Sequence, residues 1–200
     1  MKYSLSLVPS ILALLLNGCG GDSGENTPTA TVTPSTGVFI DSVVSGLHYQ
    51  TDSASGDTNV AGEFKYLPGE TITFSVGGIA LGSAKAASVL SPLDLVPTAQ
   101  DITDTEVTNI VRLLMTLDSD GDETNGISIA PAVVVAAENL TVNFKSVNFS
   151  ADAGVIALLN ALPVGTMLAG TGDAQLHLST SLSQWGNLVW GSGAWQAPAP

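Results

Sequence analysis

Residues 63–81 read EFKYLPGETITFSVGGIAL and decide how the N-terminal half of the chain folds. Three short runs rich in β-branched and aromatic residues are separated by the pairs Pro68-Gly69 and Gly77-Gly78. Runs of this length, broken by glycine and proline, are typical of antiparallel strands joined by tight turns. The stretch therefore predicts part of a β-meander or a β-sandwich.

The same pattern extends upstream of this stretch. Short apolar runs occur at Val38-Phe39-Ile40 and at 47–51, and small residues at Ser45-Gly46 and Ala61-Gly62 separate them from their neighbours. We therefore expect residues 37–90 to form an antiparallel β module.

A helix is predicted directly after the β module. Thr103 and Glu106 have the spacing of a capping box at the start of that helix. Apolar side chains then recur at positions i, i+3, i+4, i+7 and i+10, which share one helix face. These residues are Val107, Ile110, Val111, Leu114 and Leu117. Arg112 lies off this apolar stripe, and we expect it to be a solvated or locally paired cation.

The remainder of the domain, residues 91–182, mixes helices with irregular segments. We expect a short apolar segment at 133–136, a strand at 140–144, a helix at 155–162 with Asp152 near its N-terminus, and a helix at 173–182. Together these elements predict an α+β fold, an antiparallel β-sandwich or meander packed with two or three helices. His48 and His177 lie inside predicted elements and are expected to be packing or surface residues.

One turn resembles a known family. The stretch Thr58-Asn59-Val60-Ala61-Gly62-Glu63-Phe64 is similar to the Thr-Asp-x-x-Gly-x-Phe turn of carboxypeptidase-regulatory-like and CNA-B-like β-sandwich modules, with Asn59 in place of Asp, and the preceding run 41–49 is similar too. The resemblance implies that Gly62 turns a hairpin and that Phe64 enters the core. Residues from 37 to about 125 also resemble a module of Gram-negative surface proteins and lipoproteins. Such modules serve many functions, so the resemblance indicates fold rather than activity.

The sequence DSDGDETNG at residues 118–126 carries the best chemical signal in the chain. Calcium takes about six to eight oxygen ligands, and EF-hand loops offer carboxylates at positions 1, 3 and 5 and a backbone carbonyl at position 7. Asp118, Asp120, Asp122 and the carbonyl of Thr124 fall at these positions, and Glu123 is a further candidate ligand. We therefore expect a calcium site here.

This loop also departs from the EF-hand pattern. Glu123 replaces the usual glycine at position 6, and Ile129 stands where a bidentate glutamate is usual. The partial ligand set predicts a dissociation constant of about 10⁻⁴ to 10⁻³ M, unless Glu123, Asp101 or Asp104 completes the ligand set. The alternative is a metal-free turn, because Asp and Asn favour turns by bonding their own backbone.

The N-terminus has the shape of a bacterial lipoprotein signal. A basic start and an apolar run precede Leu16-Asn17-Gly18-Cys19, and Cys19 is the only cysteine in the chain. The apolar run is shorter than the roughly 20 residues of a membrane-spanning helix. We expect residues 1–18 to be cleaved and Cys19 to carry lipid, with Gly20 indicating the outer membrane. The alternative is an ordinary secretory signal.

Composition predicts a flexible tether after the lipidation site and argues against one class of partner. Residues 19–36 contain mostly Gly, Ser, Thr, Pro and acids, and are expected to be disordered. The whole chain has 5 Lys and Arg against 18 Asp and Glu, a formal net charge of −13. Such an acidic surface argues against a nucleic acid partner.

The C-terminal stretch 183–200 contains all three tryptophans, Trp185, Trp190 and Trp195. Exposed indole rings bind sugars or protein partners. The five-residue spacing fits no regular face, so the alternative is a tail whose indoles pack back onto the domain.

Motifs of the common enzyme classes are missing from the sequence. It contains no nucleophile elbow, phosphate-binding loop, zinc-protease motif or dinucleotide fingerprint. We therefore expect a non-catalytic, calcium-stabilised binding or structural module anchored to the outer membrane, with a role in adhesion or surface assembly and a protein or glycan partner. The alternatives are a carbohydrate-binding or hydrolase-accessory lipoprotein that uses the tryptophans, and a small hydrolase.

Overall fold

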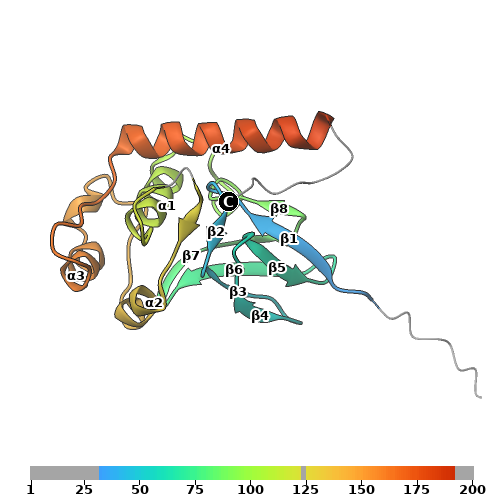
Figure 1. Cartoon of the computed structure of the whole chain (residues 1–200), viewed down its shortest axis with the longest axis horizontal. Coiled ribbons are helices and arrows are strands. Elements are labelled where there is room, and N and C mark those ends of the chain that lie inside the picture. The colour runs from blue at the N-terminus through green and yellow to red at the C-terminus, as the bar shows by residue number, and fades with distance from the viewer. Residues whose placement is uncertain (1–31, 123–124, 192–200) are drawn as a thin grey trace, which may run out of the picture. The chain divides into compact units, whose positions relative to one another are not determined.

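The computed structural model describes residues 32–122 and 125–191 (Figure 1). The first half of this region consists of short strands. They are β1 (Ser35–Phe39), β2 (Val44–Ser45), β3 (His48–Gln50), β4 (Ser55–Asp57), β5 (Glu63–Tyr66), β6 (Thr71–Val76), β7 (Ile79–Lys85) and β8 (Val89–Leu90). A ninth strand, β9 (Ile127–Ser128), follows the Asp-rich loop. The β-rich module predicted at 37–90 is therefore present.

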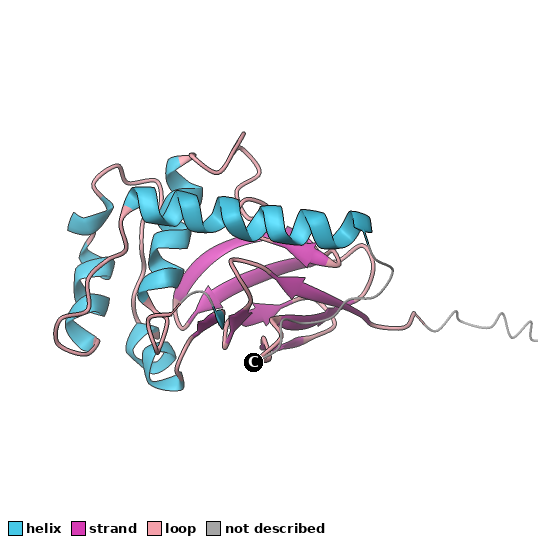
Figure 2. Cartoon of the chain, turned by 45° about the horizontal axis from the view of Figure 1, so that its top comes forward, coloured by secondary structure: helices cyan, strands magenta, loops and turns pink. Residues whose placement is uncertain are grey.

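The strands form three small sheets (Figure 2). The largest has the order β4-β3-β6-β7 and is antiparallel throughout. The second has the order β5-β1-β8, in which β8 runs parallel to β1. The third is the parallel pair β2-β9, which joins the β module to the segment after the Asp-rich loop.

The turns between residues 59 and 78 have different roles. Gly77-Gly78 makes a hairpin between β6 and β7, with Val76 opposite Ile79, and Gly77 has a φ of +54°. Pro68-Gly69 instead connects strands of two different sheets. Gly62 has a φ of +68° in the turn that begins at Asn59, but the strands on either side of this turn, β4 and β5, also pair in different sheets.

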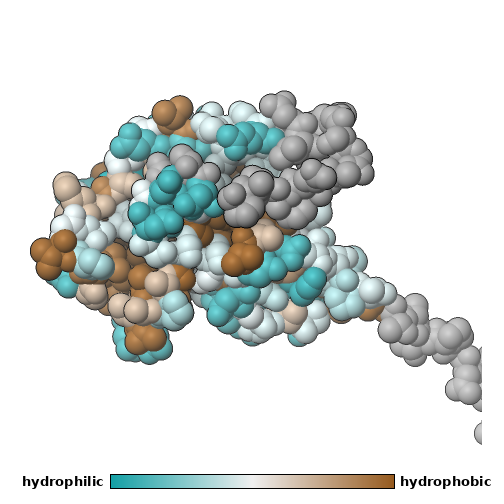
Figure 3. All heavy atoms as spheres, viewed as in Figure 1, coloured by the Kyte–Doolittle hydropathy of each residue, from teal (hydrophilic) through white to brown (hydrophobic). Residues whose placement is uncertain are grey.

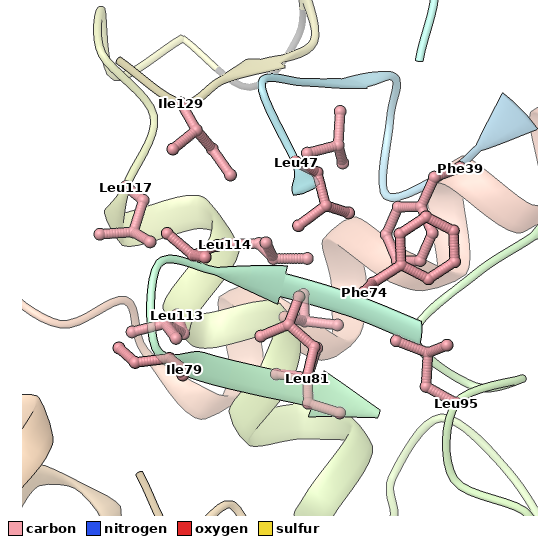
Figure 4. Close-up of a cluster of buried hydrophobic side chains, with 14 of the residues drawn as sticks. Phe39, Leu47, Phe74, Ile79, Leu81, Leu95, Leu113, Leu114, Leu117 and Ile129 are labelled. Atoms are coloured by element: carbon pink, nitrogen blue, oxygen red, sulfur yellow. The ribbon is translucent and has the colours of Figure 1, made fainter. Parts of the chain in front are cut away.

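Aromatic side chains fill the space between the sheets. The rings of Phe39 and Phe74 have centroids 4.6 Å apart, and those of Phe64 and Phe74 are 5.4 Å apart. All three side chains are at most 1 % exposed. Figure 4 shows Phe39 and Phe74 side by side, with leucines of helix α1 facing the same cluster. Burial of these aromatic and aliphatic surfaces holds the strands to the helices.

Four α-helices make up most of the second half of the described chain. They are α1 (Thr105–Thr116), α2 (Pro131–Ala137), α3 (Ala153–Ala161) and α4 (Thr171–Gly191), with a short 3-10 turn, η2 (Phe149–Ala151), before α3. In Figure 1, α4 lies along one side of the domain over α1, and α2 and α3 lie toward the end away from β4. The α+β fold class predicted from the sequence is confirmed.

Helix α1 buries the predicted apolar stripe, but its cap differs from the prediction. All five stripe residues are at most 2 % exposed. The N-cap is Asp104, whose side chain accepts a hydrogen bond from the N–H of Glu106. Thr103 instead bonds to Asp101, at 2.8 Å from its N–H and 2.6 Å from its hydroxyl. The capping box predicted at Thr103 is therefore wrong.

Between residues 130 and 191 the structure differs from the predictions at 140–144 and at the end of the last helix. The apolar segment at 133–136 is part of helix α2, which begins at Pro131. Residues 140–144, predicted as a strand, form no strand. Helix α3 has the predicted Asp152 cap, which accepts from the N–H groups of Gly154 and Val155. The helix expected at 173–182 extends to Gly191, so residues 183–191 are helical.

The segment around residue 32 separates two parts of the chain. One compact unit begins at Val32, close to the predicted junction of tether and domain at residues 36 and 37, and β1 begins at Ser35. Among the described residues, no helix is long and apolar enough to cross a membrane.

Candidate calcium loop and adjoining cavity

The Asp-rich loop is held at both ends by the protein core. Helix α1 ends at Thr116, and Leu117 is 2 % exposed just before the first carboxylate, Asp118. At the other end Ile127 is 1 % exposed, and its N–H donates to the carbonyl of Val43 at 2.8 Å. The loop therefore emerges between a helix and a paired strand.

The two ends of the loop are also bonded to each other. Asp118 and Ile129 form an isolated antiparallel bridge. The N–H of Ser119 donates to the carbonyl of Ser128 at 3.0 Å, and the N–H of Ser128 donates to Oδ1 of Asp118 at 2.9 Å. The predicted loop is thus a closed structure, and its first ligand position is fixed by the strand that follows.

Asp120 organises the interior of the loop. Its Oδ1 accepts from the N–H of Asp122 at 3.0 Å, and its Oδ2 accepts from the side-chain amide of Asn125 at 3.1 Å. Gly121 between them has a φ of +71°, which favours glycine. Both carboxylate oxygens of Asp120 are therefore used in hydrogen bonds inside the loop.

The carboxylate of Asp118 is only half satisfied. Oδ1 accepts from Ser128, whereas Oδ2 is buried and has no hydrogen-bond partner among the described residues. Burial raises the pKa of Asp118, and the neighbouring Asp120 charge raises it further against the lowering effect of the Ser128 N–H. The pKa of Asp120 is lowered, mainly by the N–H of Asp122 and then by Asn125. The loop thus holds negative charge next to an oxygen that lacks a donor in the described structure.

The other predicted ligands are placed less completely. Asp122 lies in the loop, while Glu123 and Thr124 lie outside the described residues. Asp101 and Asp104 precede the first turn of α1, whereas the loop follows its last turn. Twelve residues of helix span roughly 18 Å, so neither carboxylate can complete the ligand set. In the described part of the chain, no three His, Cys, Asp or Glu side chains are grouped as a ready metal site.

A cavity of about 610 Å³ adjoins the loop. Its wall is mostly apolar and comes from the end of α1, from α2 and from the segment after α3; it includes Met115, Val133, Leu162 and Met167. Asp118, Asp120 and Gly121 form part of the lining. An apolar concavity with a few polar groups at one side is typical of a ligand site.

Apolar side chains are also exposed around this cavity. Met167 is 82 % exposed and Val164 is fully exposed on the segment that follows α3. In Figure 3, apolar residues gather over the end of the molecule that contains α2 and α3. Arg112 fixes this segment by donating from Nε to the carbonyl of Ala169 at 2.8 Å, and the guanidinium also lies 5.5 Å from the Phe149 ring centroid. Arg112 was predicted to be either solvated or locally paired, and these contacts show that it is paired.

The tryptophans and the lipidation site contribute little to the described structure. Trp185 is half-buried on α4. The side chain of Trp190 and all of Trp195 lie outside the described residues, as does Cys19.

One further pair of residues has no signal in the sequence. Asp41, in the turn between β1 and β2, is 0 % exposed, and its Oδ1 lies 3.4 Å from Nε2 of His177 on α4. The run 41–49 showed only a resemblance to β-sandwich modules, and His177 was expected to be a packing or surface residue. No local pattern could have shown that they meet.

No protein-family model, curated protein or solved structure matches the chain. The α+β fold, the closed Asp loop and the adjoining cavity are therefore the basis for assigning a function.

Proposed function

We propose that this chain is a non-catalytic binding or structural module, tethered to the outer membrane through lipid on Cys19 and stabilised by calcium in the loop that begins at Asp118. Its role is adhesion or surface assembly, with a protein or glycan as partner.

The observation that carries the calcium proposal is the buried Oδ2 of Asp118. A buried acceptor without a donor is costly unless a cation or water compensates it. Calcium prefers carboxylate and carbonyl oxygens. Here an oxygen with no partner among the described residues stands beside a second carboxylate, and Asp122 occupies the next ligand position. A cation would supply the positive charge that this loop needs.

The apolar cavity supports the binding role. It shares Asp118 and Asp120 with the loop, so a cation held by these residues would stabilise one wall of the cavity. The exposed Met167 at its edge offers apolar surface to a partner. Calcium would therefore support the binding surface without taking part in chemistry.

Thermal unfolding of the mature chain in calcium and in chelator tests the metal part. For a dissociation constant of about 10⁻⁴ to 10⁻³ M, about 10 mM calcium stabilises by roughly 1.4 to 2.7 kcal/mol. For a domain of this size that corresponds to a rise of roughly 3 to 11 °C in Tm. Equal melting temperatures in calcium and chelator would refute the metal part and leave the tether untouched.

Cell fractionation tests the tether. The wild-type chain is expected in the outer-membrane fraction, and Cys19→Ser is expected to remove it from that fraction because no sulfur remains to carry lipid. An unchanged distribution of Cys19→Ser would contradict lipidation at Cys19, and absence of the wild type from the outer-membrane fraction would favour the ordinary secretory signal.

A further inference from the structure

Two buried ionisable side chains face each other where helix α4 meets the turn between β1 and β2. Asp41 Oδ1 and His177 Nε2 are 3.4 Å apart; the Asp41 residue is 0 % exposed and the His177 side chain 8 %. In the part of the chain that the structure describes, neither oxygen of Asp41 nor Nε2 of His177 has a hydrogen-bond partner. Such orphaned groups are rare in a core and need an explanation.

A second contact joins the same helix to the same turn. Ser181, one helical turn beyond His177, accepts a hydrogen bond of 2.8 Å from the N–H of Ser42 and donates one of 3.0 Å to the carbonyl of His177. Ser42 has a φ of +57°, which is unusual for a non-glycine residue. The turn is therefore held against α4 at two adjacent points, and one of them is ionisable.

Within residues 32–122 and 125–191, no Lys or Arg is placed to compensate Asp41. A cavity of about 320 Å³ lies beside His177, and its described lining includes one carboxylate, the exposed Asp173, but no Lys or Arg. On α1, which also packs against α4, Glu106 pairs with Lys145 at 3.7 Å and Arg112 bonds to the carbonyl of Ala169. His177 is therefore the group that can share a proton with Asp41.

We propose that a single proton held between Asp41 and His177 fastens helix α4 to the β1–β2 turn, and that loss of this proton as the pH rises releases the helix. With the proton present, the pair is either a neutral O–H···N contact or an ion pair, and both satisfy the facing atoms. Without it, a carboxylate with no compensating charge stays buried against a neutral imidazole. We call this contact between Asp41 and His177 the latch. It involves no residue of the calcium loop.

The direction of the pH effect follows from the burial of Asp41. Burial raises the pKa of Asp41 well above its ordinary value of 3.8. In the unfolded chain an ordinary histidine holds one proton up to about pH 6.5, so the folded pair binds more protons than the unfolded chain only above that pH. The stability that the shared proton contributes is therefore present below about pH 6.5 and is lost as the pH rises from there, by up to about tenfold in the folding equilibrium constant for each pH unit.

Unfolding of the mature chain in chelator, followed from about pH 5 to about pH 9, tests the latch. Stability of the wild type is expected to fall with rising pH above about pH 6.5, and Asp41→Asn is expected to remove most of that fall. His48 and Asp57 form a similar pair, 2.8 Å apart but exposed, so Asp57→Asn is the matched control and should keep the wild-type slope. Equal slopes for wild type and Asp41→Asn would overturn the proposal.

Amide hydrogen exchange in the wild type locates the effect and does not depend on a variant that folds. After correction for intrinsic rates, the protection of α4 amides is expected to fall with pH relative to that of α1 amides. Parallel loss of protection in both helices would contradict the latch, since the change would then be global. His177→Gln, which cannot bind a proton, serves in the unfolding experiment if Asp41→Asn fails to fold.

Discussion

The N–H of Ser128 donates a 2.9 Å hydrogen bond to Oδ1 of Asp118, and Oδ2 of the same carboxylate is buried with no donor among the described residues. This asymmetry distinguishes the Asp loop from a simple turn. A turn built by Asp and Asn side chains would satisfy itself within the loop, as Asp120 does with the N–H of Asp122 and the side-chain amide of Asn125. Among the described residues of the loop, Asp118 does so with only one of its two oxygens.

Asp118→Asn is expected to have opposite effects in chelator and in calcium. Without calcium, removal of a partly buried charge beside Asp120 leaves stability unchanged or raises it by up to about 1 kcal/mol. With calcium, the variant gains less than the wild type because a ligand carboxylate is lost. Melting temperatures in both conditions measure this. Asp52→Asn, which removes an exposed charge elsewhere, is the control and should follow the wild type in both.

Calcium affinity is expected to decrease as the pH falls. A carboxylate must be deprotonated to bind calcium, and the pKa of Asp118 is raised above its ordinary value of 3.8. Protons therefore compete with calcium at a higher pH than they would for an ordinary aspartate. Titrations at about pH 5 and about pH 7 compare the two dissociation constants. An affinity that is the same at both would argue against Asp118 as a ligand.

Gly77→Ala is expected to destabilise the domain by at least about 2 kcal/mol. Gly77 has a φ of +54°, and a Cβ there would lie 2.5 Å from the carbonyl oxygen of Val134 in α2. Gly69→Ala is the matched control, since its φ is +93° but no atom lies within 4 Å of an added Cβ. Chemical denaturation should show a cost of only about 1 kcal/mol for the control, from backbone strain alone. Similar costs for both variants would mean that the hairpin does not press on α2.

Met167→Ala is expected to change stability by less than about 0.5 kcal/mol, because Met167 is 82 % exposed beside the cavity. Leu158→Ala on α3 is the contrast; its side chain is 1 % exposed, and its loss should cost about 2 to 5 kcal/mol. Unfolding of both variants tests whether the cavity rim is dispensable for folding. A large loss for Met167→Ala would show that this methionine has a structural role.

The sequence predicted the elements that depend on neighbouring residues. The apolar stripe of α1 and the Asp152 cap of α3 are local patterns, because both are set within a few residues of chain. The Gly77-Gly78 hairpin is local in the same way. All three lie in the structure where the sequence predicts them.

Elements that depend on distant contacts were not predicted. Three consecutive valines at 133–135 favour a strand, yet they lie in α2, which begins at Pro131 and packs its end against Gly77 and Gly78. Residues 140–144 form no strand, and the carbonyl of Phe144 accepts instead from the side chain of Asn109 in α1. Tertiary contacts thus outweighed local preference in both segments.

The candidate site was predicted only in part, because some of its geometry also depends on contacts between distant residues. The spacing of Asp118, Asp120 and Asp122 was visible in the sequence, whereas the asymmetry of the Asp118 carboxylate depends on Ser128 returning beside it. One part of the cavity wall comes from residues 161–169, and Arg112 of α1 holds this segment through the carbonyl of Ala169. Local sequence patterns do not predict contacts between residues so far apart in the chain.

Calorimetric titration of calcium into the mature chain at neutral pH tests the central claim most directly. We predict saturable binding with a dissociation constant of about 10⁻⁴ to 10⁻³ M, unchanged in Asp52→Asn and weakened at least about tenfold in Asp118→Asn. No saturable binding by the wild type, or equal affinities for the wild type and Asp118→Asn, would contradict it.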